Sequence, residues 1–284
     1  MSDTERKPDV STVIVNTNTR DWLEGCLNSL EAADNYESLQ VIVVENASTD
    51  GSRELLAERF PWAQAIHQEK TIGFGPANNV GAREAKSDIL LFLNQDTVVE
   101  PDSLRLFLEA LDDHPNWGAA GGIIFDGDDE RECSTGSYPT MASLVLNRLL
   151  ITIPFLRPLF GLSAFQHWKG YDRIRHVGWV TGAYLWIRRD LFETIGGFDE
   201  AIFLYCEDVD LCYRVTERGY DCLYLPAGPI VHHRNKAPVP RERKMMQREY
   251  LAYFGRKHYQ LSRYTLTRAL LWFLARNVKN ELAN

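Results

Sequence analysis

The chain has 284 residues, of which 45% are hydrophobic and 25% are charged, and its formal net charge at pH 7 is −8. This length fits one large domain, or one domain with an appendage, and the composition is typical of a globular protein with a proper core. The acidic balance argues against nucleic acid as the main partner, because binding a phosphate backbone usually needs a clustered basic surface.

The cysteines and the N-terminal segment indicate a reducing compartment. Five cysteines are present and none forms a CxxC pair, which argues against a zinc site or a disulfide framework. Residues 1–10 are polar and lack the apolar region of a signal peptide. No apolar run reaches the roughly 18 residues that span a bilayer. We therefore expect a cytoplasmic protein, with membrane contact limited to peripheral binding at the inner face of the cell membrane.

The first half of the chain alternates predicted strands and helices. Near-continuous apolar strands indicate a parallel sheet that is covered by helices on both faces. The predicted strands are Val10–Val15, Leu39–Val44, Ala65–His67, Ile89–Leu93 and Ala119–Phe125, and the predicted helices are Trp22–Leu30, Glu54–Phe60, Asn78–Ala85 and Pro101–Leu111.

The second half is less regular. An acidic loop at 126–132 and an aromatic, proline-broken stretch at 139–170 come first. Further strands are predicted at Val180–Ile187, Cys222–Leu225 and Pro229–His232, a helix with an acidic first turn at Asp208–Arg218, and a basic, aromatic helical segment from Arg241 onward. We therefore predict an α/β domain over 1–240, with halves at about 10–125 and 126–240, and a C-terminal helical segment over 241–284.

A first acidic motif, Asn94-Gln95-Asp96, directly follows the predicted strand at Ile89–Leu93. Open α/β sheets bind ligands at the carboxyl ends of their strands. Carboxylate and amide oxygens on a tight turn suit Mg²⁺ or Mn²⁺ carrying a diphosphate. The alternative is a simple turn, because Asn and Asp are common turn formers.

A second acidic motif, Glu207-Asp208-Val209-Asp210, lies at a predicted helix start after an apolar run at 202–205. One interpretation is a capping cluster that complements the helix dipole. The apolar and aromatic neighbours favour a partly buried site instead. A buried carboxylate near like charges has a raised pKa and can act as a general base.

Polar turns follow the first two predicted strands. Asn16 and Asn18 follow the first strand, and Glu45 and Asn46 follow the second. At one edge of a sheet these groups can hold a nucleobase and a ribose. The alternative is a cap and turn that lead into the helix at Glu54.

The glycine-rich stretch 73–81 superficially resembles a dinucleotide fingerprint. It does not follow the first strand, and Pro76 and Asn78 break the glycine spacing, which argues against a Rossmann dehydrogenase. A glycine-rich loop that enters a helix still allows backbone N–H groups to approach a ligand.

His232 and His233 end the last predicted strand. Successive side chains of a strand point to opposite faces, so at most one of the two rings can face a site. We favour His232 as a metal ligand, against the alternative of a structural histidine.

The order of these motifs resembles family 2 inverting glycosyltransferases of the GT-A fold, in particular the rhamnosyltransferase-like group. The resemblance implies a GT-A fold with a mostly parallel central sheet flanked by helices. It also implies transfer of a sugar, such as rhamnose, from a nucleoside-diphosphate donor to an acceptor hydroxyl in cell-surface polysaccharide or glycolipid synthesis. The motifs are VIVNTN (13–18), VVENASTDG (43–51), GFGPANNVGA (73–82), LFLNQDTVV (91–99), VTGAYLWIRRDLFETIGGFDE (180–200), FLYCEDVDLCYR (203–214) and LPAGPIVHH (225–233).

The resemblance assigns roles to residues by position. Asp96 matches the last residue of the metal-binding DxD element, His232 the histidine that completes the metal site, and Asp208 the catalytic base. Mg²⁺ or Mn²⁺ is the implied cofactor. The donor-binding set is Asn16, Asn18, Glu45, Asn46, Gly73, Asn78, Asn79, Asn94 and Gln95, and the residues that support the base or the acceptor are Gly182, Glu207 and Asp210.

Two positions depart from the family pattern. Asn94 and Gln95 replace the earlier DxD residues, so that Asp96 is the one carboxylate of this element. Glu45 stands where the family usually has Asp, which leaves uracil and thymine, and therefore UDP- and dTDP-sugars, open as donors.

Two other function classes stay open. A nucleotidyltransferase would carry a glycine-rich, basic loop after its first strand, whereas this chain has Asn16-Thr17-Asn18-Thr19 there. A non-catalytic nucleotide-sugar binder is expected to lose the base first, and Asp208 is present.

The basic and aromatic stretches at 139–170 and 241–278 also have two interpretations. Such segments can lie on an anionic membrane, and the resemblance adds a reason, because many family members use saccharide acceptors linked to lipids. Alternatively, these stretches pack on the domain itself or on a second subunit, as in a homodimer.

Overall fold

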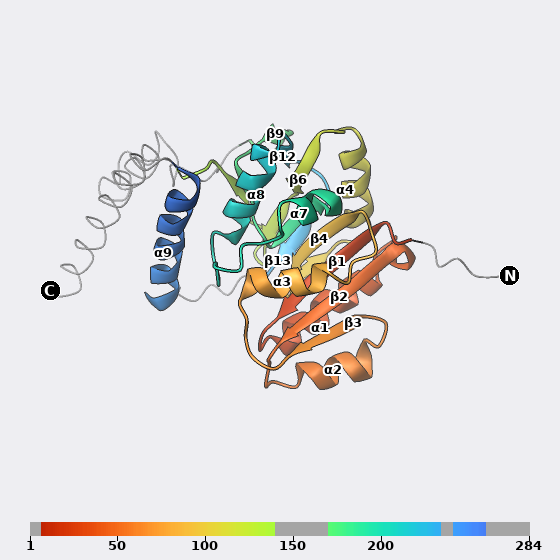
Figure 1. Ribbon diagram of the computed structural model, residues 1–284. Coiled ribbons are helices and arrows are strands. Elements are labelled where there is room, and N and C mark those ends of the chain that lie inside the picture. The colour runs from red at the N-terminus through yellow and green to blue at the C-terminus, as the bar shows by residue number, and fades with distance from the viewer. Residues whose placement is uncertain (1–6, 140–169, 234–240, 260–284) are drawn as a thin grey trace.

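An eight-stranded sheet with helices on both faces forms the centre of the protein (Figure 1). The computed structural model describes residues 7–139, 170–233 and 241–259. The strand order across the sheet is β3-β2-β1-β4-β11-β6-β12-β9. In chain order these strands are β1 (Val10–Asn16), β2 (Leu39–Asn46), β3 (Gln64–Gln68), β4 (Ile89–Asn94), β6 (Trp117–Gly121), β9 (Arg175–His176), β11 (Tyr184–Arg188) and β12 (Asp221–Tyr224).

The direction of the strands confirms the predicted α/β class with a mostly parallel sheet. β1 pairs in parallel with β2 and β4, and β2 pairs in parallel with β3. β12 is parallel to β6. The central exception is β11, which is antiparallel to both β4 and β6 and therefore joins the two halves of the sheet.

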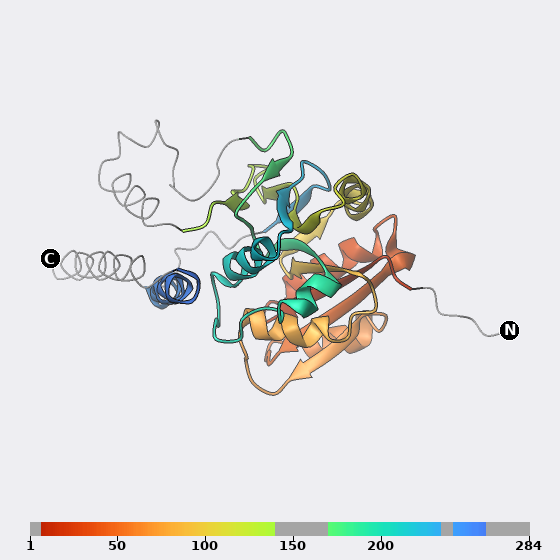
Figure 2. The ribbon, with the colours of Figure 1, turned by 45° about the horizontal axis from the view of Figure 1, so that its top comes forward.

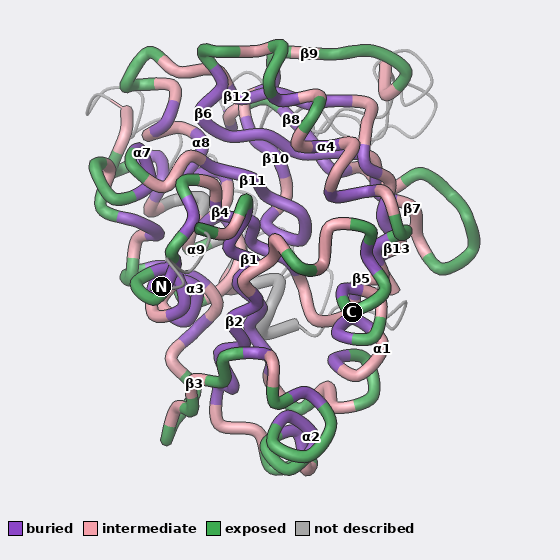
Figure 3. Tube along the Cα trace, turned by 90° about the vertical axis from the view of Figure 1, so that its right-hand side faces the viewer, coloured by how far each residue is buried: buried purple, intermediate pink, exposed green. Residues whose placement is uncertain are grey.

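Two apolar cores cover the two faces of the sheet. In β1, Ile14 belongs to one core while Val13 and Val15 belong to the other, as the two-residue period of a strand requires. Figures 2 and 3 show these layers and the buried strands between them. Helices α1 (Arg20–Glu31), α2 (Ser52–Arg59) and α4 (Ser103–Asp112) pack on the first face, and α3 (Phe74–Ala82), α7 (Arg189–Thr194), α8 (Glu207–Glu217) and α9 (Arg241–His258) pack on the second.

Two smaller sheets and a short 3₁₀ turn, Tyr36–Ser38, complete the described fold. In one sheet, β13 (Ile230–His232) is antiparallel to β5 (Thr97–Val99) and parallel to β7 (Ile124–Asp126). The other sheet pairs β8 (Thr135–Gly136) with β10 (Trp179–Val180). The β5–β13 pairing carries His232 to the turn that follows β4.

Two predicted strands are wrong in extent because each breaks where the chain changes sheets. The predicted strand Ala119–Phe125 is divided into β6 and β7 by a break at Gly122-Ile123. A Cβ at Gly122 would lie 2.7 Å from the carbonyl oxygen of Ala227, so only glycine fits at this break. The predicted strand Val180–Ile187 is likewise two strands, β10 and β11, with a turn at 181–183 between them.

The C-terminal helical segment begins as predicted, at Arg241, and its last turns pack on the second face of the sheet. Phe254 is 1% exposed and stacks near Tyr138 and Tyr213. Within the described ranges, no helix combines the length and apolarity that crossing a bilayer requires. Most of the stretches 139–170 and 241–278, for which membrane or subunit contact was predicted, lie outside the described residues.

Close packing of α3 on the sheet generates a stability prediction. A Cβ at Gly81 would lie 2.4 Å from Val13 Cγ1 and 3.0 Å from Val44 Cγ2. We expect Gly81→Ala to lower the free energy of unfolding by about 1–3 kcal/mol, because overpacking strains a tight core. The matched control is Gly25→Ala in α1, where nothing lies within 4 Å of the added atom.

For Gly25→Ala we expect a gain of up to about 1 kcal/mol, from the better helix propensity of alanine. Urea denaturation of both variants checks the pair. Equal changes in the free energy of unfolding of Gly81→Ala and Gly25→Ala would contradict the packing argument.

Candidate active site

The carboxyl ends of three parallel strands bring predicted site residues together. Asn16 of β1 is in register with Glu45 of β2, and Val15, the residue before Asn16, is in register with Asn94 of β4. Asn16, Glu45 and Asn94 therefore end neighbouring strands at one edge of the sheet, where open α/β sheets bind their ligands.

Most of the predicted donor-binding side chains shape the loops at this edge. Asn16 accepts a hydrogen bond from Thr19 Oγ1 at 2.7 Å and donates to Ser48 Oγ at 3.2 Å. Asn18 has a left-handed backbone with φ 52°, and its Oδ1 accepts from Thr49 N at 2.8 Å. These contacts fix the loops after β1 and β2 against each other.

Glu45 is completely buried, and both of its carboxylate oxygens already have partners. Oε2 lies 2.7 Å from Arg53 Nε, and Oε1 accepts from Ser48 N at 2.6 Å. The neighbouring Asn46 accepts from Ile72 N at 3.0 Å and so holds the glycine-rich loop. Glu45 therefore fixes the loop after β2 through both of its carboxylate oxygens.

The glycine-rich loop is held by the segment that precedes α8. Gly73 has φ 90°, and a Cβ there would lie 2.7 Å from Phe203 O. The side chain of Asn79 pairs with both the N–H and the carbonyl of Phe198, at 2.8 and 2.9 Å. Asn78 donates to Phe74 O at 3.1 Å. Both asparagines are buried and join α3 to its surroundings.

A carboxylate–histidine–carboxylate chain forms beyond β4. Asp96 Oδ1 lies 3.2 Å from His232 Nε2, and His232 Nδ1 lies 2.9 Å from Glu132 Oε2. Asn94 Nδ2 is 3.3 Å from the same Nε2, whereas the half-buried Gln95 completes the turn. Glu132 was not predicted as a site residue; its acidic loop was the only sequence signal, and 100 residues separate it from His232.

The two carboxylates determine the protonation of this histidine. Burial lowers the pKa of His232, but the hydrogen bonds to Asp96 and Glu132 outweigh that effect and raise it to about 9. Without a competing cation, the imidazole is therefore protonated at neutral pH and balances the two acids.

The chemistry of Asp96 and His232 fits a divalent cation. Asp96 Oδ1 is buried and, apart from its ion pair with His232 Nε2, has no hydrogen-bond partner among the described residues. Its 3.2 Å separation from His232 Nε2 is close to the ~3 Å between adjacent ligands that each lie ~2.1 Å from one ion. Glu132 on Nδ1 would direct Nε2 toward that ion. Within the described ranges, no group of three or more His, Cys, Asp or Glu side chains could hold a metal by itself. The pair therefore needs oxygens from a substrate or water.

Asp208 lies at the start of α8, and its two oxygens accept backbone hydrogen bonds. Gly182 N donates to Oδ2 at 3.1 Å and Val209 N donates to Oδ1 at 2.8 Å. Burial nevertheless raises the pKa of Asp208. Tyr205 and Cys206, just before the helix, both have φ 71°. Such left-handed non-glycine residues cost about 1–3 kcal/mol each and are typical of functional sites.

Glu207 is a buried carboxyl beside Asp208. Burial, followed by the charge of Asp208, raises the pKa of Glu207 to about 8. Its Oε2 has no hydrogen-bond partner among the described residues. With a pKa of about 8, Glu207 is mostly protonated at pH 7 and adds little negative charge beside Asp208.

The turn at 181–183 connects the two acidic motifs. Asn94 N donates to Ala183 O at 3.1 Å, while Gly182 N donates to Asp208. The motif after β4 and the start of α8 thus contact adjacent residues of one turn. They belong to one site.

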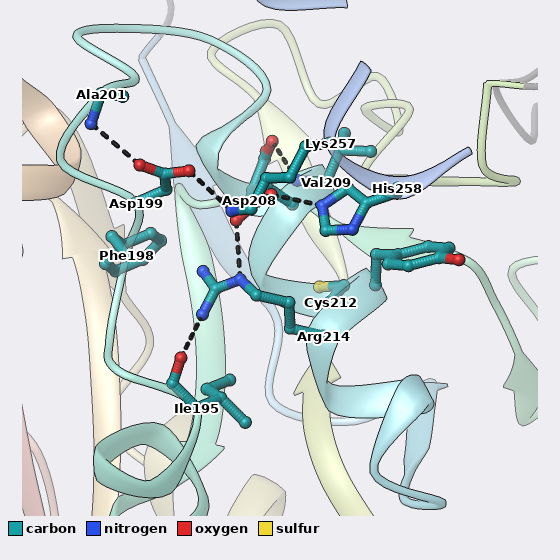
Figure 4. Close-up of polar contacts among 12 residues, drawn as sticks. Ile195, Phe198, Asp199, Ala201, Asp208, Val209, Cys212, Arg214, Lys257 and His258 are labelled. Atoms are coloured by element: carbon teal, nitrogen blue, oxygen red, sulfur yellow. Dashed lines mark hydrogen bonds and ion pairs between the residues drawn. The ribbon is translucent and has the colours of Figure 1, made fainter. Parts of the chain in front are cut away.

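Asp210, the third carboxylate of the second motif, has a different environment. It is 0% exposed, and its oxygens lie 2.8 Å from Arg214 Nε, 2.8 Å from Lys257 Nζ and 2.6 Å from His258 Nε2. Figure 4 shows these three side chains converging from α8 and α9. Burial raises the pKa of Asp210, but His258, Arg214 and Lys257 together lower it to about 2. Asp210 is therefore a permanently charged structural group.

Residues 11–195 match the family described as Glycosyl transferase family 2. The chain belongs to this family and is a glycosyltransferase. Over 223 residues it is 30% identical to N-acetylglucosaminyl-diphospho-decaprenol L-rhamnosyltransferase of Mycobacterium tuberculosis (strain ATCC 25618 / H37Rv), covering 75% of this chain and 72% of the relative. Over 230 residues it is 24% identical to rhamnosyltransferase WbbL of Escherichia coli (strain K12), covering 78% and 82%. The predicted similarity to the rhamnosyltransferase-like group is confirmed.

Solved structures confirm the GT-A fold. Mannosyltransferase PcManGT from Pyrobaculum calidifontis, in complex with GDP-Man and Mn²⁺, superposes with a TM-score of 0.62 at 19% identity, over 89% of this chain and 64% of that one. GalNAc-T7 with UDP, GalNAc and Mn²⁺ has a TM-score of 0.59 at 14% identity, over 81% and 45%. The chain thus spans less than two thirds of either structure.

The raised pKa of Glu207 generates a prediction on stability. Because its folded pKa of about 8 lies above the ordinary value of 4.5, the folded state binds this proton more tightly than the unfolded state does. The resulting stabilisation is fully present below about pH 4.5 and is lost as the pH rises through 8. Glu207→Gln keeps the neutral form at every pH.

We expect the stability of Glu207→Gln relative to the wild type to increase between pH 5 and pH 8, by on the order of 1–3 kcal/mol. Chemical denaturation at both pH values measures this change. The control is Glu58→Gln, an exposed glutamate of α2. If the difference in free energy of unfolding between Glu207→Gln and the wild type stays constant with pH, the raised pKa of Glu207 is contradicted.

Proposed function

We propose that the protein is a metal-dependent, inverting glycosyltransferase that moves a sugar from a nucleoside diphosphate to an acceptor hydroxyl. The observation that carries this proposal is the turn at 181–183, which ties the base Asp208 to the element that contains Asp96. A proton acceptor and a cation site then lie on either side of one reaction centre. Family membership supports the reaction class.

Asp208 is the proposed general base. Its two backbone hydrogen bonds fix the carboxylate, and its raised pKa increases its affinity for the acceptor proton. As Asp208 takes that proton, the acceptor oxygen attacks the anomeric carbon from the face opposite the diphosphate. A single displacement of this kind inverts the anomeric configuration.

Asp96 and His232 are the proposed protein ligands of Mg²⁺ or Mn²⁺. Such an ion would supply charge neutralisation on the departing nucleoside diphosphate. Glu132 would hold the proton on His232 Nδ1, which leaves Nε2 free to bind. Hard cations of this type commonly combine one or two protein ligands with substrate phosphates, as a two-residue element requires.

The donor and the acceptor are proposed from the relatives. The half at about 10–125 would bind a dTDP- or UDP-sugar, and the half at 126–240 would bind a saccharide acceptor, free or lipid-linked. Rhamnose is the proposed sugar, because two of the relatives are named as rhamnosyltransferases and one name includes a decaprenol diphosphate. A role in cell-surface polysaccharide or glycolipid synthesis, at the cytoplasmic face of the membrane, follows from such an acceptor.

The base assignment is tested by Asp208→Asn. We expect kcat to fall by about 10²–10⁴-fold with donor affinity retained, because general-base catalysis contributes that factor. Sugar transfer and donor hydrolysis, assayed over a panel of dTDP- and UDP-sugars, measure the change. The control is Asp112→Asn at the exposed end of α4. Near-normal turnover by Asp208→Asn would exclude Asp208 as the base.

The same panel, extended with nucleoside triphosphates and a sugar phosphate, separates the other function classes. A nucleotidyltransferase would release inorganic diphosphate from a nucleoside triphosphate, and a non-catalytic binder would leave every donor intact with or without acceptor.

The metal element is tested through Glu132. We expect Glu132→Gln to lower the affinity for Mn²⁺ by about 10–100-fold, because residues that orient a ligating histidine typically have that effect. Calorimetric titration of Mn²⁺ in the presence of a nucleoside diphosphate measures it. Glu130→Gln, an exposed residue of the same loop, is the control. Equal affinities in the two variants would argue against the proposed His232 site.

A further inference from the structure

We propose that Lys257 of α9 is a positioning residue for the catalytic helix α8, an inference that rests on the proposed function. Its Nζ lies 2.6 Å from Asp199 Oδ2 and 2.8 Å from Asp210 Oδ1. Asp199 is in the loop before the base, and Asp210 is in the first turn of the helix that carries it. One ammonium thus joins the two segments that flank Asp208 (Figure 4).

The start of α8 depends on tertiary contacts for its position. Its N-cap, Cys206, makes no side-chain capping hydrogen bond, and Tyr205 and Cys206 both have left-handed backbones. A helix entered through left-handed residues departs from the usual extended conformation of an N-cap. The partners of Asp210 therefore contribute to the placement of the neighbouring Asp208.

Charge balance identifies Lys257 as the bridging group. Arg214, on α8 itself, neutralises only one of the two carboxylates, Asp199 and Asp210. Lys257 supplies the second positive charge and contacts both acids. His258 also contacts Asp210, at 2.6 Å, but no contact of His258 reaches Asp199 among the interactions of the described residues. A buried carboxylate that lost a cation would shift or take up a proton.

Other contacts hold α9 in place independently of Lys257. Phe254 is buried against Tyr138 and Tyr213, and the His258 ring lies 4.4 Å from the Tyr213 ring. Tyr253 donates a hydrogen bond to Asp199 Oδ2 at 2.8 Å. The ammonium can therefore be removed while the helix keeps its apolar anchor.

A small displacement of the proposed base Asp208 is expected to lower the rate of sugar transfer. Asp208 Oδ2 is held by Gly182 N at 3.1 Å, and this contact relates the base to the turn that supports the metal element. A movement of about 1 Å at a catalytic group can cost on the order of 10²-fold in rate. Lys257 lies outside the stretch 11–195 that matches the family, so this contact is a property of the C-terminal segment of the chain.

The test compares Lys257→Met with Lys257→Arg in the full chain. For Lys257→Met we expect kcat to fall by about 10–10²-fold, because the base is misplaced, while the KM for the donor stays within about twofold. Lys257→Arg restores the charge and most of kcat. Arg105→Met, which removes an exposed ion pair with Glu109 on α4, is the control for loss of a surface cation.

Asp199→Asn provides a second variant that leaves every cation of Asp210 in place. We expect it to lower kcat without raising the donor KM, and thermal melting confirms that each variant is folded at the assay temperature. The proposal is overturned if Lys257→Met and Asp199→Asn turn over like Arg105→Met, or if Lys257→Arg is as slow as Lys257→Met. It is also overturned if the donor KM rises in proportion to the loss of kcat.

These outcomes are separable from failure of the proposed function. If Asp208→Asn transfers sugar at the wild-type rate, the proposed function fails. If Asp208→Asn is inactive but Lys257→Met has wild-type kcat, only the positioning role fails.

Discussion

The antiparallel strand β11 is the constraint on which the site depends. A purely parallel sheet would continue past β4 through a crossover connection, whereas β11 runs back along β4 and pairs with β6 on its other side. The turn that enters β11 therefore lies beside the carboxyl end of β4. One carbonyl of this turn accepts from Asn94 and one N–H donates to Asp208. Two motifs that are distant in sequence thereby share one site.

The pKa values of neighbouring carboxylates in this site shift in opposite directions. For Glu207 and Asp208 desolvation is the largest effect, and it raises both pKa values. Asp210 is buried among three cationic or basic side chains, and its pKa falls to about 2. With a pKa of about 8, Glu207 can hold and release a proton near neutral pH, and Asp210 cannot. Environments that push the pKa values of neighbouring acids apart assign them separate roles.

The sequence predicted the strands and strand-end residues that depend on a local pattern of apolar side chains. The strands that became β1, β2 and β4 were found because both of their faces are buried, and the ends of those strands located Asn16, Glu45 and Asp96. Chain breaks set by packing were missed, as at Gly122-Ile123. Glu132 and Lys257 were also missed, because each acts on a residue far away in sequence, with 100 positions between Glu132 and His232. No periodicity or motif spacing records such a contact.

The central claim is that one divalent ion binds between Asp96 and His232 in the site that contains Asp208. A crystal structure with Mn²⁺ and a nucleoside diphosphate, with manganese located by anomalous scattering, tests it most directly. The account predicts one manganese peak about 2.1 Å from both Asp96 Oδ1 and His232 Nε2, with diphosphate oxygens as further ligands. A nucleotide bound at this edge of the sheet with manganese elsewhere, or with His232 still hydrogen-bonded to Asp96, would contradict it.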